Sequence, residues 1–282
     1  MAVTIHDEGA HVAPHPESLP GSALEAGRMP GHWLLARLGK RVLRPGGVEI
    51  TTKLLDAVAV SADDDVVEVA PGLGATTRLL LEPGPASYTG VDRDPDAADL
   101  VASMLDGPNR RTVHASATDT GLPDASADVV FGEAYLTMQP DSLKRKAVAE
   151  LARLLRPGGR FALHEIAYRD DDAGENVRDS VKEDLTSTIK VSVNPMTPAA
   201  WKELLAEHDL EVRQAFTAPL HLLEPRRLVA DEGFGGALRF ASRVARDGDA
   251  RRRVLAMRKA MSSHEDDIEA IGLVAVKRVP SS

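Results

Sequence analysis

Cysteine is absent from the sequence, and its absence excludes disulfide bonds, thiolate zinc sites and cysteine nucleophiles. An excess of positive charge is also missing, because the net charge is −9, which argues against a protein that coats nucleic acid. No apolar run approaches the roughly 20 residues that cross a bilayer, and the polar opening of the chain lacks the apolar core of a signal peptide. We therefore expect a soluble cytoplasmic protein with no membrane span and no nucleic-acid partner.

The 282 residues suffice for one domain of roughly 200–250 residues with additions. Residues 1–30 are rich in proline, glycine, histidine and acid, which is typical of a mobile arm. The histidines of this arm are irregularly spaced, so we predict no metal site there. Residues 31–62 are expected to form a helical segment or lid, and residues 63–282 the main domain, with a helical insertion at about 224–263.

Four basic residues lie close together near the start of the chain: Arg37, Lys40, Arg41 and Arg44. Apolar residues recur at helical spacing over 32–43, and the Arg-Pro-Gly-Gly that follows is a typical helix stop. We interpret the basic residues as a solvated face of this helix, because long charged side chains readily reach water. An anion-binding or lid surface is the alternative.

Strands and helices alternate along the rest of the chain, which is the pattern of a parallel sheet with crossover helices. Asp94, followed by Pro95, is suited to cap one helix, and Thr197 to cap another. The expected fold class is α/β, a doubly wound and mostly parallel seven-stranded sheet with N-terminal helices and a helical insertion before the last strand. The strands are expected at 66–69, 87–91, 112–114, 128–131, 160–166, 210–218 and 268–276, and the helices at 49–60, 76–81, 95–105, 142–155, 175–193 and 199–208.

The most informative segment joins the first two of these strands. The run at 66–69 is short and rich in valine, as expected for a strand that helices cover on both faces. Gly72 and Gly74 follow, and glycine allows a sharp turn and close approach of a ligand to main-chain N–H groups at a helix N-terminus. Asp92 lies 18 residues past Gly74, where a carboxylate can accept hydrogen bonds from both ribose hydroxyls. This segment predicts a nucleoside-cofactor site.

Four motifs follow one another between about 66 and 166: Glu-Val-Ala-Pro-Gly-Leu-Gly at 68–74, Gly-Val-Asp at 90–92, Leu-Pro-Asp-Ala-Ser-Ala-Asp-Val-Val at 122–130 and Leu-Leu-Arg-Pro-Gly-Gly-Arg at 154–160. They resemble the cofactor loop, the ribose-binding strand end, the entry to the fourth strand and the following turn of the class I S-adenosylmethionine-dependent methyltransferases. Within that class they are most similar to the small-molecule branch typified by the ubiquinone and menaquinone C-methyltransferases.

The resemblance implies an enzyme that uses S-adenosyl-L-methionine, releases S-adenosyl-L-homocysteine and methylates a small organic acceptor. Glu68 would bind the ammonium of the methionine moiety, and Arg93 would stack on adenine or stay solvated. Two positions depart from the family: Ala70 replaces its usual first glycine, and Ser116 replaces an aspartate that often accepts from the adenine amino group. The expected cofactor-binding residues are Glu68, Ala70, Gly72, Gly74, Asp92, Arg93, Ser116, Ala117 and Glu133.

NAD binding is the natural competitor, because the same turn and carboxylate serve dinucleotides. The third glycine position of the dinucleotide fingerprint holds Thr77 here, and the later motifs resemble the methyltransferases instead. A second alternative is a cofactor-binding or regulatory protein that keeps the fold and transfers no methyl group. The retained glycines and Asp92 argue against it.

Methyl transfer is an in-line displacement, for which the protein supplies positioning and a dry pocket. A general base is needed only if the acceptor must lose a proton. Side-chain alternation lets only one of His164 and Glu165 face the pocket. The candidates at strand ends are Glu133, His164, Glu165 and His221. Any single residue of this kind is more often a structural polar group than a base.

Apolar walls for the acceptor are expected from Met29, Trp33 and the residues at 135–138, with core packing as the alternative. The insertion at 225–263 contains Gly233, Gly235 and Gly236, which we expect to interrupt its helices. It is expected to form a lid or the surface of a homodimer, unless it is only a solvated helical layer.

Overall fold

The computed structural model describes residues 25, 27–41, 44–220 and 223–279. Within these residues seven strands form one sheet in the order β3-β2-β1-β4-β5-β7-β6. Neighbouring strands are parallel, except that β7 runs antiparallel to β5 and β6. The doubly wound, mostly parallel sheet is therefore confirmed. Its strands are β1 (Asp65–Val69), β2 (Ser87–Asp92), β3 (Arg110–His114), β4 (Ala127–Glu133), β5 (Leu155–Tyr168), β6 (Leu210–Pro219) and β7 (Ile268–Lys277).

Helices cover both faces of the sheet because successive strand residues point to opposite faces and both sets are apolar. In β1, Val66 belongs to a core with Leu54, whereas Val67 belongs to a second core with Leu151. The first core contains residues of α2 (Gly47–Val58), α3 (Ala75–Leu81) and α4 (Pro95–Ala102), and the second contains residues of α5 (Asp141–Leu154) and α7 (Pro198–Ala206).

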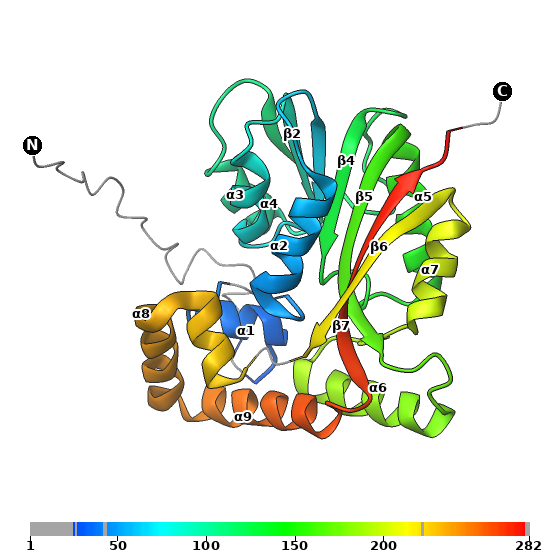
Figure 1. Cartoon of the computed structure of the whole chain (residues 1–282). Helices are drawn as coiled ribbons and strands as arrows, with labels where there is room; N and C mark the ends of the chain where they lie inside the picture. The colour runs from blue at the N-terminus through cyan, green and yellow to red at the C-terminus, as the bar shows by residue number, and fades with distance from the viewer. Residues whose placement is uncertain (1–24, 26, 42–43, 221–222, 280–282) are drawn as a thin grey trace, which may run out of the picture.

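The remaining helices gather beyond one end of the sheet (Figure 1). They are α1 (Gly31–Arg37), α6 (Glu175–Ile189), α8 (Pro225–Arg246) and α9 (Gly248–Ser263). The arrowheads of β4 and β5 point toward this group in the figure, so it stands at the carboxyl ends of the parallel strands. Ligands of open α/β sheets bind at that end.

Both predicted helix caps are present. The Asp94 side chain accepts hydrogen bonds from the backbone N–H groups of Asp96 and Ala97 at the start of α4, and Thr197 accepts one from Ala200 at the start of α7. Each cap satisfies N–H groups that the first helical turn leaves unpaired. Local sequence signals therefore located these helix starts correctly.

The helix expected over 32–43 is wrong at its C-terminal end. α1 stops at Arg37, and Gly39 follows with a φ of +100°, a left-handed conformation that favours glycine. The chain then turns inward, so Lys40 and Arg44 are only 0% and 5% exposed. The prediction that these basic side chains are solvated is therefore wrong for Lys40 and Arg44, although Arg41 is exposed.

The insertion before β7 folds as the two helices α8 and α9. Gly233 has a φ of +69° inside α8 and kinks that helix, as expected. Gly235 and Gly236 lie within regular helix, so the prediction that they break it is wrong. An isolated glycine costs a helix only about 1 kcal/mol, which packing readily offsets.

The predicted arm at residues 1–30 falls largely outside the described residues. At its end, Met29 is buried with 1% exposure, and its carbonyl accepts a hydrogen bond from the Arg253 guanidinium at 2.6 Å. The boundary that we placed between residues 62 and 63 stays a prediction.

Lys40 connects the segment after α1 to α8 through an ion pair. Its Nζ lies 3.0 Å from Oδ2 of Asp231, and the two side chains are 0% and 1% exposed. Glu232 accepts from the Arg41 backbone N–H at 2.7 Å. A buried ion pair adds little net stability, but the removal of one partner leaves the other charge desolvated.

We expect Lys40→Ala to lower the free energy of unfolding by about 3–5 kcal/mol, because Asp231 would keep its burial and lose its cation. Arg37→Ala is the matched control, since the Arg37–Asp247 pair is long at 3.8 Å and partly exposed, and should cost less than about 1 kcal/mol. Urea denaturation measures both. Equal losses of unfolding free energy in the two variants would show that the Lys40–Asp231 pair is not a buried pair on which stability depends.

Candidate functional site

The turn after β1 has the backbone shape of a cofactor loop. Ala70, Gly72 and Gly74 have φ values of +52°, +54° and +70°, all in the left-handed region. Ala70 therefore adopts a conformation that favours glycine, which is the residue that the resemblance implies at this position. A Cβ on Gly74 would lie 2.7 Å from the sulfur of Met104. Met104 would have to move to admit a side chain, and the positive φ also favours glycine at this position. Gly74 does not line the cavity described below.

Asp92 ends β2 and connects that strand to the turn. One carboxylate oxygen accepts from the Gly72 N–H at 3.3 Å, and the other from the Asp94 N–H at 3.0 Å. Burial raises the pKa of Asp92 above its ordinary value. Its side chain is 8% exposed and lies on the cavity wall, beside the exposed Arg93.

Glu68 is a buried carboxyl group at the same end of β1. Its Oε2 accepts hydrogen bonds from the hydroxyls of Thr77 at 2.6 Å and Tyr88 at 2.5 Å. Burial raises the pKa of Glu68 to about 7, against the effect of these two donors. Thr77, which argued against the dinucleotide fingerprint, therefore serves to hold Glu68.

Glu133, at the end of β4, accepts hydrogen bonds from four other segments of the chain. Arg44 donates to it at 2.8 Å, Thr51 at 2.5 Å and the Nδ1 of His164 at 2.7 Å, and the Thr76 hydroxyl also contacts it. Burial alone would raise the pKa of Glu133, but the charge of Arg44 and these donors outweigh it and hold the pKa well below its ordinary value. Glu133 is thus a fixed carboxylate and a weak proton acceptor.

His164 and Glu165 point to opposite sides of β5, and only Glu165 lines the cavity, as expected. Glu165 accepts from the backbone N–H groups of Tyr135, Leu136 and Thr137 at 3.0, 2.7 and 2.9 Å, and from the Thr137 hydroxyl at 2.6 Å. Burial raises its pKa. These bonds occupy both oxygens, so Glu165 holds the loop after β4 in place.

Ser116 lies in a turn after β3 and is exposed. Its hydroxyl is 2.8 Å from the Thr118 hydroxyl and accepts from the Thr118 N–H at 3.2 Å. Both Ser116 and Ala117 line the cavity. His221, the last candidate base, lies outside the described residues.

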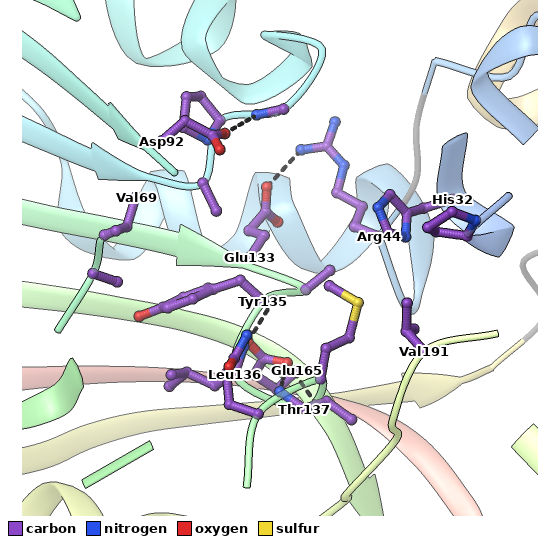
Figure 2. A pocket seen from close by; sticks show the side chains of 18 of the residues that line it. His32, Arg44, Val69, Asp92, Glu133, Tyr135, Leu136, Thr137, Glu165 and Val191 are labelled. Atoms are coloured by element: carbon purple, nitrogen blue, oxygen red, sulfur yellow. Dashed lines mark hydrogen bonds and ion pairs between the residues drawn. The ribbon is translucent and has the colours of Figure 1, made fainter. Parts of the chain in front are cut away.

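One cavity of about 450 Å³ joins these groups, and Figure 2 shows Asp92, Glu133, Tyr135 and Glu165 around it. The cofactor-loop end is polar. The other end is walled by apolar side chains from α1, α6, α9 and the segment after α6, namely Trp33, Ile189, Val191, Val193, Met257 and Met261. Of the predicted walls, Trp33 and residues 135–138 line the cavity, and Met29 does not.

His32 also lines the cavity. Its ring lies 4.7 Å from that of Trp33, and its Nδ1 is buried without a hydrogen-bond partner among the described residues. Burial lowers the pKa of His32 to about 4, and Arg93 adds to this effect. The ring is therefore neutral at pH 7.

Arg44, Thr51 and Thr76 belong to the site but were absent from the residues expected there. The sequence contained one signal, the basic cluster around Arg44, yet no spacing connects residue 44 to residue 133. Among the described residues no group of His, Asp and Glu side chains is suited to hold a metal ion. The same part of the chain contains no helix that is long and apolar enough to span a bilayer.

The strand order, with β7 antiparallel between β5 and β6, is that of the methyltransferase class of α/β proteins, and the glycine turn and the carboxylate that ends β2 are consistent with it. A family model described as "Methyltransferase domain" matches residues 67–163. A protein of Haemophilus influenzae described only as uncharacterized is 32% identical over 251 residues, which cover 88% of this chain and 98% of that protein. A protein of Mycobacterium tuberculosis described as an uncharacterized methyltransferase is 30% identical over 173 residues, which cover 54% of this chain and 67% of that protein. The chain belongs to this methyltransferase family.

Two further proteins are similar to the chain. The 27-O-demethylrifamycin SV methyltransferase of Amycolatopsis mediterranei is 30% identical over 134 residues, or 45% of this chain and 48% of that protein. Phosphoethanolamine N-methyltransferase 2 of Haemonchus contortus, solved with phosphomonomethylethanolamine and S-adenosylhomocysteine, superposes with a TM-score of 0.66 at 14% identity, over 88% of this chain and 58% of that one. At that identity the second likeness concerns the fold alone.

We expect Glu165→Ala to lower the free energy of unfolding by about 3 kcal/mol or more, because three buried N–H groups would lose their acceptor. Glu165→Gln keeps one acceptor oxygen and should cost less. Glu211→Ala removes an exposed carboxylate paired with Arg213 and should change stability by less than about 1 kcal/mol. Wild-type stability of Glu165→Ala in urea would show that the loop does not depend on Glu165.

Proposed function

We propose that this protein transfers a methyl group from S-adenosyl-L-methionine to a small organic acceptor with a largely apolar body. One observation carries the proposal: a single cavity runs from the glycine turn, Glu68 and Asp92 to an apolar chamber between α1, α6 and α9. A cofactor and an acceptor bound at the two ends would meet near Glu133 and Tyr135.

The polar end offers a partner for each part of the cofactor. The Asp92 carboxylate is suited to both ribose hydroxyls, and the turn after β1 allows close approach to its backbone. Glu68 is suited to the ammonium of the methionine moiety. Ser116 and Ala117 line the wall where adenine would lie. The Haemonchus neighbour, which was solved with S-adenosylhomocysteine, supports this choice of ligand.

Bound S-adenosylmethionine supplies an electrophilic methyl group on a good leaving group. What the chain must add is position and the exclusion of water. Glu165 fixes the loop at 135–137 beside the reaction space, and the apolar side chains at the other end of the cavity offer water no hydrogen-bond partners. Glu133 and Glu165 are both committed to other hydrogen bonds, so neither is free to act as a general base.

The apolar chamber favours an acceptor that is mostly hydrocarbon. The Amycolatopsis relative, whose name gives a demethylrifamycin as its substrate, supports a small molecule. We place the chain in the small-molecule branch typified by the quinone C-methyltransferases. The absence of turnover across a broad panel of acceptors, despite saturable cofactor binding, would favour the alternative of a protein that binds and does not transfer.

Calorimetry with S-adenosylhomocysteine and with NAD tests the proposal. We expect the first ligand to bind and the second not to bind.

Asp92→Ala should weaken the binding of S-adenosylhomocysteine by about 1–3 kcal/mol, because the ribose hydroxyls would lose their hydrogen-bond acceptor. The nearby control Asp96→Ala should leave the binding unchanged. Binding of NAD in place of S-adenosylhomocysteine would overturn the proposed function.

Cofactor affinity should depend on pH through Glu68. Its pKa of about 7 means that the carboxyl group must lose a proton before it pairs with an ammonium. Affinity for S-adenosylhomocysteine should therefore rise about tenfold between pH 6 and pH 8. Glu68→Gln should abolish this rise, and 5′-methylthioadenosine, which lacks the amino acid part, should not show it. A rise of equal size with both ligands would contradict the role of Glu68.

A further inference from the structure

The helices α8 and α9 leave apolar side chains in water. Six large apolar residues are exposed among those described, and four of them lie on these two helices: Val229, Phe234, Leu238 and Leu255. Phe234 and Leu238 are 77% and 62% exposed. Single exposed apolar residues are ordinary, but a concentration of them marks an interaction surface.

The C-terminal part of α8 carries a stripe of exposed apolar residues. Phe234, Leu238, Ala241 and Ala245 are all exposed, and their spacing of four, three and four residues returns to one helix face. Phe240 faces the other way and is buried with 3% exposure. The helix therefore packs inward through one face and presents a second apolar face outward.

The charge of the two helices is opposite to that of the whole chain. Residues 225–263 contain ten Arg and Lys against four Asp and Glu, whereas the chain as a whole has a net charge of −9. Arg239 and Arg246 follow the stripe residues Leu238 and Ala245 and lie along one side of the stripe. Arg251 and Arg258 lie one turn on either side of Leu255. These four arginines are exposed and form no ion pair with the residues that the structure describes.

The inner face of α9 belongs to the cavity. Met257 and Met261 line its apolar end, while Leu255 on the same helix is exposed. Figure 1 shows α8 and α9 at the margin of the molecule, away from β2, α3 and α4. The helix α9, which walls the apolar chamber, thus also carries Leu255, Arg251 and Arg258 on its exposed side, next in the chain to the stripe on α8.

We propose that α8 and α9 dock on an anionic lipid surface, with Phe234 and Leu238 inserted among the headgroups and the flanking arginines on lipid phosphates. Interfacial helices bind by this combination of an apolar face and basic flanks. A second copy of the chain fits less well, because a two-fold contact would bring the same arginines against each other. A nucleic acid would match the arginines and leave the apolar stripe in water.

Cosedimentation of the full-length protein with lipid vesicles tests the surface. We expect binding to vesicles that contain phosphatidylglycerol, at least about tenfold weaker binding to phosphatidylcholine alone, and a decrease in binding as salt is added. The double variants Phe234→Ser/Leu238→Ser and Arg239→Ser/Arg246→Ser should each lower the affinity about tenfold or more. Because these residues are exposed, the circular dichroism of both variants should match that of the wild type.

Val279→Ser and Arg111→Ser are the matched controls, since both residues are exposed and lie outside α8 and α9. They should bind vesicles as the wild type does. The proposal would be overturned if the wild type does not bind anionic vesicles, or if the double variants bind them as strongly as the controls do. If the wild type is a dimer and the Phe234→Ser/Leu238→Ser variant is a monomer, the surface binds a second copy of the chain. Preferred binding to single-stranded DNA or to polyglutamate would likewise assign the surface to a different partner.

Discussion

The carboxylate of Glu133 is the constraint on which the site depends. It lies at the end of β4 and is held by side chains from the segment before α2, from α2, from α3 and from β5. A buried carboxylate is tolerated only when charge and hydrogen bonds compensate for lost hydration. Arg44 supplies the charge, so the burial of Glu133 depends on the packing of the N-terminal segment against the sheet.

This arrangement joins the two ends of the cavity. Arg44 and Thr76 are themselves hydrogen-bonded at 2.5 Å, which connects the N-terminal segment to the helix that begins at the glycine turn. The cofactor loop and the α1 wall of the chamber are thus positioned by one group of side chains. The two ends of the cavity therefore share one set of supporting hydrogen bonds.

Local patterns predicted the fold well. The strands at 66–69 and 87–91, the Asp94 and Thr197 caps and the kink at Gly233 all depend on neighbouring residues, and the structure confirms each of them. The basic cluster was misjudged for the opposite reason. Whether Lys40 is solvated depends on Asp231, 191 residues away along the chain, and no local spacing reports that distance.

The sequence by itself determined the sheet, the glycine turn and the carboxylate at the end of β2, because strand periodicity, helix caps and left-handed turns are short-range properties. Tertiary structure decided which polar groups are free. Glu133 and Glu165 are equally plausible bases in the sequence, yet long-range contacts give the first a cation and the second three loop N–H groups. The chemical role of a carboxylate follows from the partners that folding brings to it.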